Sequence, residues 1–351
     1  MVVKTKILAV PPDGSGGDAA YREAARLLQK GELVAFPSET VYGLGGDACR
    51  LEAVEAIFRV KGRPSDNPLI VHVASADQAL EFGVALDSRF TKLADTFWPG
   101  PLTLVLPLKA SCQAITGKGL GTIALRVPGH PVALRLIRES GLALAAPSAN
   151  LSGKPSPTTA QHVAQDLTDR VALILDGGPC RVGIESTVLD LSTSRSQILR
   201  PGSIDASSLA KMLGEPVELA KSEAVKLKSP GTRYQHYQPN AAVWILPEEM
   251  GPVLWSSFQK CIEQSGLRWG YAGMRHLSNP DVPRVTLQNT EESYAEGFYR
   301  ALRWLDDRQV QVILIDSPPA SSAALWDRLS RAAQAKASDI QTLKDLIAQK
   351  K

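Results

Sequence analysis

The sequence predicts an α/β protein built from two domains. Its 351 residues correspond to two domains of ordinary size, and 44% hydrophobic and 21% charged residues allow each to bury a core. Short apolar runs alternate with stretches of helical spacing along most of the chain, which is typical of α/β folds. A mixed polar stretch over residues 214–240 separates a larger N-terminal part from a smaller C-terminal part and is interpreted as a linker.

The N-terminal part begins with a predicted helix from Asp18 to Lys30. Asp18 is the candidate N-cap, and Gly31 stops the helix because glycine favours the left-handed position after a C-terminus. A buried strand over Leu33–Phe36 follows and ends at Pro37. The apolar face of the helix consists of Tyr21, Ala24, Ala25 and Leu28.

The rest of the N-terminal part continues the same alternation. A helix over Leu51–Val60 must end before Pro64, because a residue that precedes proline is restricted away from the helical region. Further strands are predicted at Leu69–Val73, Leu102–Leu106, Thr122–Val127, Leu142–Ala146, Val171–Leu175 and Thr187–Leu191. Further helices are predicted at Ser88–Phe97, Val132–Ser140 and Thr159–Leu167. The order of the strands in the sheet does not follow from the sequence.

The C-terminal part, from Ala241 onward, repeats the α/β alternation on a smaller scale. The apolar runs stop after Ile204, and they resume beyond the linker. Strands are predicted at Val243–Leu246, Trp269–Ala272 and Val310–Asp316, and helices at Val253–Ser265, Glu292–Asp306 and Ala323–Ala335.

Composition narrows the class of function. A net charge of +3 is low for a dedicated nucleic-acid binder and suits an enzyme for anionic ligands. The four cysteines lie far apart, without a C-x-x-C pair or a cysteine–histidine cluster, so no metal ligands and no disulfide framework are predicted. No signal-like or membrane-length apolar run is present, and we expect a cytoplasmic protein that does not contact membranes.

The usual nucleotide signatures are missing from the sequence. It contains no G-x-x-x-x-G-K-[ST] motif, and neither Gly43–Gly46 nor Gly117–Gly121 is a G-x-G-x-x-G loop after a strand. Both glycine-rich stretches are interpreted as tight turns.

Several polar segments form a candidate anion site. Lys61 and Arg63 are spaced i, i+2, and so are Ser148 and Asn150, so each pair projects to one side of an extended segment. If the pairs converge, they offer charge and hydrogen bonds to a polyphosphate. Taken singly, the cations are better explained by a solvated helix end, and Ser148 and Asn150 by a turn. Arg126 lies inside an apolar run and needs a partner, for which an anionic ligand is one candidate.

The order of these motifs along the chain resembles that of a known enzyme family. The series PSETVYGL, KGRPSDNPL, WPGPLT, LRVP, SANLSG and ESTVLD, followed by ILRPG, runs through residues 37–202 and resembles the YrdC-type domain, here over residues 8–210. The linker's SPGTRYQHYQP over residues 229–239 and the C-terminal part resemble the long, two-domain threonylcarbamoyl-AMP synthases. The resemblance implies a twisted mixed sheet with helices over 8–210, a linker or lid over 211–240, and a Rossmann-like domain over 241–351.

Members of this family join L-threonine, bicarbonate and ATP into threonylcarbamoyl-AMP and pyrophosphate, for the N6-threonylcarbamoyladenosine modification of tRNA. The resemblance therefore implies these three substrates, Mg²⁺ with the ATP, and a downstream tRNA threonylcarbamoyl transferase as partner, with at most a weak contact to tRNA. Lys61 and Arg63 are implied as catalytic residues. Arg63, Asn67, Thr122, Ser148, Asn150, Ser156, Arg200 and Tyr237 are implied to bind ATP, and Thr40, His72, Arg126, Ala146 and Ser186 to bind threonine.

Three further hypotheses accompany this interpretation. Arg233, Tyr234 and Tyr237 are predicted to fold over the nucleotide as a lid, with a plain spacer as the alternative. A YrdC-type domain that only binds RNA is a second possible function. The carbamoyltransferases that mature hydrogenases are a third, which the lack of C-x-x-C pairs disfavours.

Overall fold

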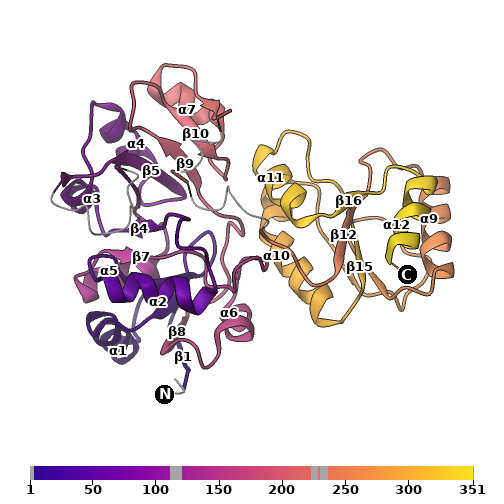
Figure 1. Ribbon diagram of the computed structural model, residues 1–351, viewed down its shortest axis with the longest axis horizontal. Coiled ribbons are helices and arrows are strands. Elements are labelled where there is room, and N and C mark those ends of the chain that lie inside the picture. Colours follow the sequence, from indigo (N-terminus) through magenta and orange to yellow (C-terminus); the bar gives the residue numbers. More distant parts are fainter. Residues whose placement is uncertain (1–3, 111–120, 223–227, 230–235, 351) are drawn as a thin grey trace. The chain divides into compact units, whose positions relative to one another are not determined.

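The computed structural model describes residues 4–110, 121–222, 228–229 and 236–350 (Figure 1). The chain divides into two compact units. The first lies within Met1–Ser152 and Ser156–Tyr234, and the second within Gly153–Pro155 and Gln235–Lys351.

The described part of the first unit is organised around an eleven-stranded mixed sheet. Its order is β1-β8-β2-β3-β7-β4-β6-β5-β9-β10-β11. The sheet contains parallel pairs, such as β4 with β6, and antiparallel pairs, such as β5 with β6. The strands are β1 (Lys6–Ala9), β2 (Val34–Phe36), β3 (Gly43–Asp47), β4 (Ile70–His72), β5 (Leu102–Pro107), β6 (Thr122–Arg126), β7 (Leu144–Ala145), β8 (Leu173–Asp176), β9 (Thr187–Asp190), β10 (Gln197–Arg200) and β11 (Glu218–Leu219).

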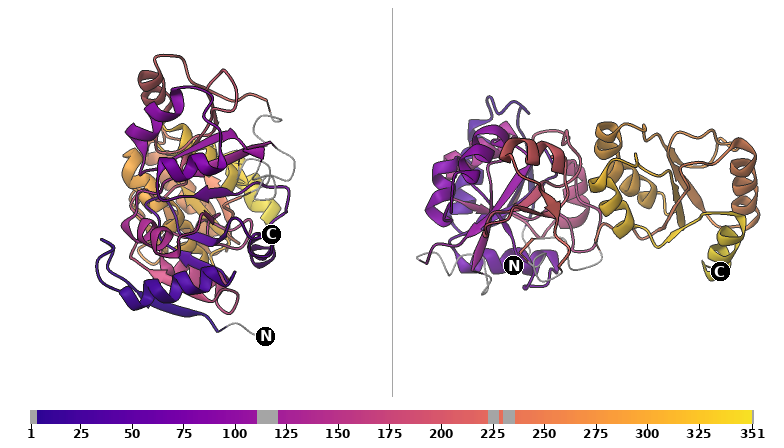
Figure 2. Two further views of the ribbon diagram at one scale, coloured as in Figure 1. Left: turned by 90° about the vertical axis from the view of Figure 1, so that its left-hand side faces the viewer. Right: turned by 90° about the horizontal axis from the view of Figure 1, so that it is seen from above.

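Helices pack against one face along this sheet, and against the other face at β2, β7 and β8 (Figure 2). Consecutive strand residues point to opposite faces, so Val34 and Phe36 of β2 pack into one apolar cluster while Ala35 packs into another. The first cluster contains the apolar faces of α1 (Asp18–Gln29) and α5 (Pro131–Ser140). The second contains those of α2 (Leu51–Lys61), α3 (Ala76–Phe82), α4 (Arg89–Phe97), α6 (Ala160–Leu167) and α7 (Ala206–Leu213). Burial of both faces explains why the strands read as continuous apolar runs.

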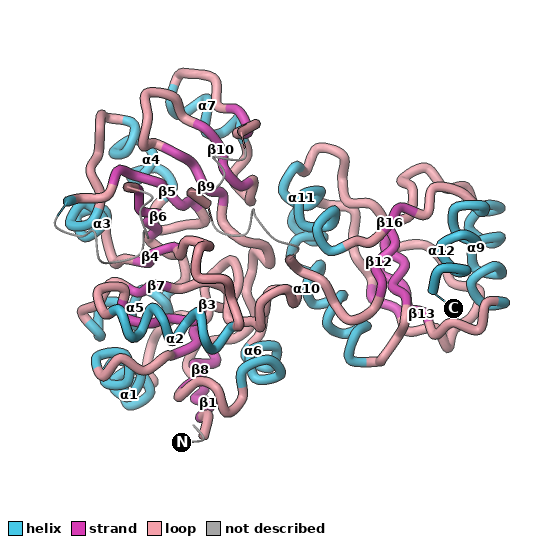
Figure 3. Tube along the Cα trace, viewed as in Figure 1, coloured by secondary structure: helices cyan, strands magenta, loops and turns pink. Residues whose placement is uncertain are grey.

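The second unit is a smaller sheet with helices on both faces. Its described strands are all paired in parallel, in the order β14-β13-β15-β12-β16. The strands are β12 (Ala242–Ile245), β13 (Trp269–Ala272), β14 (Arg284–Val285), β15 (Val312–Ile315) and β16 (Ala335–Lys336). Figure 3 shows α9 (Pro252–Gln264) and α12 (Ile340–Lys350) on one face, and α10 (Glu291–Asp307) and α11 (Ala323–Ala332) on the other. This is the Rossmann-like arrangement that the sequence predicts.

Two predicted local features differ in the structure. Gly17, with φ at 67°, is the N-cap of α1, whereas Asp18 is the first helical residue and its carboxylate pairs with Arg135. The stretch Gly43–Gly46, predicted as a turn, forms most of β3. A Cβ at Gly45 would lie 2.7 Å from the Phe36 ring, so glycine serves close strand packing here.

Most element boundaries agree with the prediction within about three residues. Helix α11 ends three residues before its predicted boundary, at Ala332, and Ala335 begins β16. Elements that the sequence analysis did not propose are β1, β3, β10, β11, β14, β16, α3, α7 and α12. Most of these are short, and several lie partly exposed, so their hydrophobic periodicity is weak.

Within the described ranges, none of the helices is long and apolar enough to span a membrane.

Candidate active site

The residues predicted to bind threonine come from the middle of the first sheet. His72 and Arg126 end the neighbouring strands β4 and β6 and are paired in register. Thr40 lies in the turn between β2 and β3, Ala146 directly follows β7, and Ser186 directly precedes β9. Strand pairing therefore brings together side chains that are far apart in the sequence.

Arg126 is held by three oxygens of the protein itself. Its Nε donates to the Gly100 carbonyl at 3.1 Å and its Nη1 to Thr40 Oγ1 at 3.0 Å. Its Nη2 donates to Glu39 Oε1 at 2.6 Å, in an ion pair whose side chains are 4% and 5% exposed. The partner that the buried charge of Arg126 requires is thus Glu39, which the sequence analysis did not single out. The sequence feature that could have identified Glu39 is its position between Ser38 and Thr40, shortly after a buried strand.

Burial and the charge of Arg126 determine the ionisation of two neighbours. Desolvation, together with the nearby Arg126, lowers the pKa of His72 from 6.5 to about 3, so its imidazole is neutral. Desolvation raises the pKa of Glu39, but Arg126 outweighs it, and the pKa lies below its ordinary value. The site therefore presents a neutral histidine beside a fixed ion pair.

Lys61 connects α2 to the loop that carries Ser148 and Asn150. It is only 2% exposed, which excludes a solvated helix end for this residue. Its Nζ donates to the carbonyls of Ser148 and Asn150, both at 2.5 Å, and approaches Asn150 Oδ1 at 3.4 Å. The Ser152 amide donates back to the Lys61 carbonyl at 2.8 Å. Lys61 therefore lies against the loop that carries Ser148 and Asn150.

Arg63 and Asn67 follow α2 on the way to β4. Arg63 is half-buried, and its Nη2 donates to the Pro68 carbonyl at 3.0 Å. Asn67 is fully buried, yet within the described residues neither its amide oxygen nor its amide nitrogen has a hydrogen-bond partner. Buried amides are normally satisfied, so Asn67 marks a place where a polar ligand is expected. Among the residues that the structure describes, the buried atoms His72 Nδ1 and Glu39 Oε2 also lack hydrogen-bond partners.

The remaining predicted residues are distributed more widely. Arg200 ends β10, and its Nη2 donates to Ser186 Oγ at 3.1 Å and to the Ser186 carbonyl at 2.9 Å. Ser156 donates to Glu185 at 2.6 Å. Thr122 begins β6, at the opposite end from Arg126.

The predicted lid residues are only partly described. Tyr237 belongs to the second unit, has φ at 70°, and its ring centre lies 5.3 Å from that of Tyr299. Arg233 and Tyr234 lie outside the described residues.

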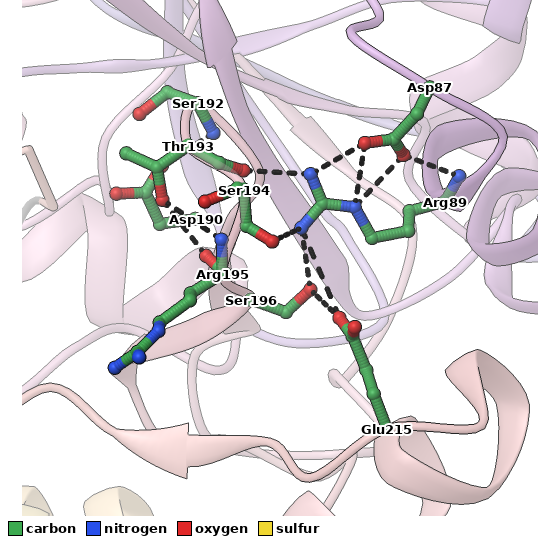
Figure 4. Close-up of polar contacts among 9 residues, drawn as sticks. All are labelled: Asp87, Arg89, Asp190, Ser192, Thr193, Ser194, Arg195, Ser196 and Glu215. Atoms are coloured by element: carbon green, nitrogen blue, oxygen red, sulfur yellow. Dashed lines mark hydrogen bonds and ion pairs between the residues drawn. The ribbon is translucent and has the colours of Figure 1, made fainter.

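A second concentration of polar groups surrounds Arg89, at the start of α4 (Figure 4). Its guanidinium contacts Asp87 and donates to the carbonyls of Thr193 and Ser194 and to Ser196 Oγ. The neighbouring pocket of about 330 Å³ is lined by Ser194, Arg195, Ser196, Gln197, Glu215, Pro216 and Glu218. The contacts of Arg89 fasten the turn between β9 and β10, which indicates a structural cluster.

Comparisons with known protein families agree on both parts of the chain. A family model described as "Telomere recombination", for Sua5, YciO and YrdC, matches residues 26–202. A model described as "Threonylcarbamoyl-AMP synthase, C-terminal domain" matches residues 204–334.

Similar proteins match along most of their length. A threonylcarbamoyl-AMP synthase of Bacillus subtilis (strain 168) is 42% identical over 344 residues, covering 95% of this chain and 98% of that protein. A threonylcarbamoyl-AMP synthase of Pyrococcus abyssi is 41% identical, and the match covers 89% of this chain and 93% of that protein. A crystal structure of P. abyssi Sua5 complexed with L-threonine matches with a TM-score of 0.86 at 38% identity, over 94% of this chain and 99% of that one.

Proposed function

The chain belongs to the threonylcarbamoyl-AMP synthase family, and from this premise we propose how its residues make threonylcarbamoyl-AMP from L-threonine, bicarbonate and ATP. The observation that carries the proposal is the set of buried, unpartnered polar atoms on Glu39, Asn67 and His72, as far as the described residues go. Such atoms are costly in a folded protein unless a ligand completes their hydrogen bonds.

The threonine end of the site is assigned to the β4–β6 region. Arg126 receives the α-carboxylate of threonine through a charge-assisted contact, which contributes about 1.5–3 kcal/mol. Thr40 and the neutral His72 provide hydrogen bonds to the rest of the amino acid, together with Ser186 and the backbone at Ala146. A neutral imidazole suits this role, because it can accept as well as donate a hydrogen bond.

The nucleotide end is assigned to the residues around the Ser148–Asn150 loop. Arg63 binds the phosphates, and Asn67, Ser148 and Asn150 form hydrogen bonds to them. The rest of ATP is bound by Thr122, Ser156 and Arg200. The Lys61 ammonium is bound to loop oxygens, so we assign Lys61 to holding this loop. Mg²⁺ enters as part of the MgATP substrate, where a few protein oxygens and the phosphates suffice for its coordination.

The chemistry requires positioning more than proton transfer. The ammonium of threonine and bicarbonate combine to a carbamate, with loss of water and one proton. A carbamate oxygen, already anionic, then attacks the α-phosphorus, and the bond to pyrophosphate breaks as its electrons leave with that group. This nucleotidyl transfer needs in-line geometry and charge neutralisation, and Arg63 supplies positive charge for it.

The product is a mixed anhydride and is open to hydrolysis, so a transferase that consumes it is required. We propose a cytoplasmic tRNA threonylcarbamoyl transferase as that partner. The other candidate function is RNA binding without catalysis, and the net charge of +3 argues weakly against it, because it is low for a dedicated nucleic-acid binder.

The test is pyrophosphate release from ATP by the purified protein. We expect release that requires both L-threonine and bicarbonate, and that falls on the order of a hundredfold in Arg63→Ala, because charge stabilisation at the phosphates is lost. ATP turnover that ignores both substrates, or no turnover at all, would contradict the proposal and favour the RNA-binding module.

The linker is proposed to act as a lid, with Tyr237 contributing to ATP binding. The support is its aromatic and cationic composition between two compact units. A chain truncated after residue 210 is expected to bind ATP more weakly than the full chain. Equal ATP affinity and turnover in the two would identify the linker as a spacer.

A further inference from the structure

Glu39 is a buried carboxylate to which the reaction assigns no role. Its main chain is fixed, because the Val182 amide donates to the Glu39 carbonyl at 2.7 Å. Its side chain is 5% exposed and points one oxygen, Oε1, at Arg126 Nη2. Gly129 lies against the same carboxylate, since a Cβ at that position would be 3.2 Å from Oε1. The carboxylate therefore has a fixed position beside the predicted threonine-binding arginine.

The contacts of Arg126 leave a defined part of its guanidinium for a ligand. An arginine carries five N–H donors, and the described residues use three of them, one each for Gly100, Thr40 and Glu39. Two donors remain, which is the number that a carboxylate accepts in a paired contact. Gly100 and Thr40 are neutral acceptors, so Glu39 supplies the strongest of the three restraints on the orientation of the guanidinium.

Glu39 also supplies the counter-charge in this part of the site. Without it, Arg126 would be a buried cation with neutral neighbours, and any small anion would be attracted to it. With it, the net charge of the pair is zero, and a carboxylate binds because it fits the two remaining donors. His130 and Cys180 also lie near Glu39. Burial lowers the pKa of His130 and raises the pKa of Cys180, so both side chains are neutral at neutral pH.

We propose that Glu39 is a positioning residue for the amino-acid substrate, which holds the Arg126 guanidinium so that its two free N–H donors meet the α-carboxylate as a pair. The inference rests on the proposed function, because it concerns the same threonine site. Its alternative is that Glu39 only stabilises the fold by neutralising Arg126.

The test compares L-threonine with L-threoninol, in which a hydroxymethyl group replaces the carboxylate. Both are offered to the full-length protein, and kcat/KM is measured by pyrophosphate release. In Glu39→Gln we expect kcat/KM for L-threonine to fall about tenfold or more, since the paired contact is charge-assisted and loses its alignment. The value for L-threoninol should change less than about threefold, because that substrate does not use the contact.

A matched control variant is Asp190→Asn. Asp190 is another buried carboxylate of the first unit, 3% exposed and 2.9 Å from Lys228, and it is not among the residues assigned to threonine. Its replacement should lower stability without changing the ratio of the two kcat/KM values. A second variant, Glu39→Asp, keeps the charge but shortens the side chain, and should reduce the ratio less than Glu39→Gln does. It also serves as the test if Glu39→Gln does not fold.

Each outcome decides between the two roles. A selective loss with L-threonine supports positioning. An equal loss with both substrates, or an unchanged ratio in both Glu39 variants, overturns it and leaves a structural role. If the unmodified protein shows no threonine-dependent release, the proposed function fails, which is a separate result.

Discussion

Asn67 shows at the scale of one residue how a ligand site costs stability. Its side chain is fully buried, and within the described residues neither polar atom of the amide is satisfied. An unsatisfied buried group costs about 1–3 kcal/mol. Stability alone would favour an apolar residue at this position, so a ligand is the better physical explanation for an asparagine.

Replacement of Asn67 by alanine should therefore separate stability from function. We expect the free energy of unfolding of Asn67→Ala to change by less than about 1 kcal/mol, because lost packing and a relieved polar penalty oppose each other. ATP affinity should fall about tenfold. Urea denaturation and ATP titration measure the two effects.

Asn150→Ala is the matched control for stability. The Asn150 amide donates to the Leu151 carbonyl, and its oxygen accepts from Ser148. Its removal should cost about 1–3 kcal/mol. Equal losses of stability in the two variants would show that Asn67 has a structural partner after all.

His72 predicts a pH dependence of stability. The pKa of about 3 in the folded chain lies below the ordinary value of 6.5, so between these values the unfolded chain binds more protons. The free energy of unfolding should therefore fall as the pH drops from about 6.5 toward 3, by up to ~1.4 kcal/mol per pH unit from this residue. His72→Gln should remove that part of the slope. Identical slopes in the two proteins between pH 6.5 and 4.5 would contradict a buried neutral histidine.

At the scale of elements, the C-terminal end of α2 and the loop that follows β7 behave as one unit. The Lys61 side chain binds two carbonyls of the loop, and the Ser152 amide binds the Lys61 carbonyl. The helix end thus fixes the segment that carries Ser148 and Asn150. This coupling explains why a lysine is buried so close to the proposed nucleotide site.

Lys61→Met should loosen the loop. We expect the amide of Ala149 to exchange hydrogen faster and the free energy of unfolding to fall by about 2–3 kcal/mol, because charge-assisted hydrogen bonds to two carbonyls are lost. Hydrogen exchange followed by mass spectrometry measures the first effect, and urea denaturation the second. If ATP affinity falls while exchange in residues 147–152 stays unchanged, Lys61 contacts the phosphates directly instead.

At the scale of the whole molecule, the two units have separate apolar cores. Leu104 and Leu125 belong to the core of the first unit, whereas Trp244 and Phe258 belong to that of the second. Units with their own cores can unfold separately.

We therefore expect scanning calorimetry of the full chain to resolve two transitions. L-threonine should raise the midpoint of one transition alone, because a ligand stabilises the unit that binds it. A single transition that shifts as a whole would mean that the units unfold together.

The sequence alone determined the alternation of helices and strands and the family. These properties depend on local periodicity and on motifs with fixed spacing, both of which are readable along the chain. The sequence analysis also considered that the i, i+2 pairs could converge, and the structure places Lys61 against the loop of Ser148 and Asn150. Short or partly exposed elements such as β1 and α7 were not predicted, because four to eight residues show too little hydrophobic periodicity.

Only the tertiary structure decided what each site residue contacts. The ion pair of Glu39 with Arg126 joins residues 87 positions apart, and it exists because β6 ends beside the turn that follows β2. The sheet order that creates this proximity depends on long-range strand pairing, which no local pattern specifies. The pKa of His72 and the unsatisfied amide of Asn67 depend likewise on burial by distant segments, and burial is a property of the folded chain.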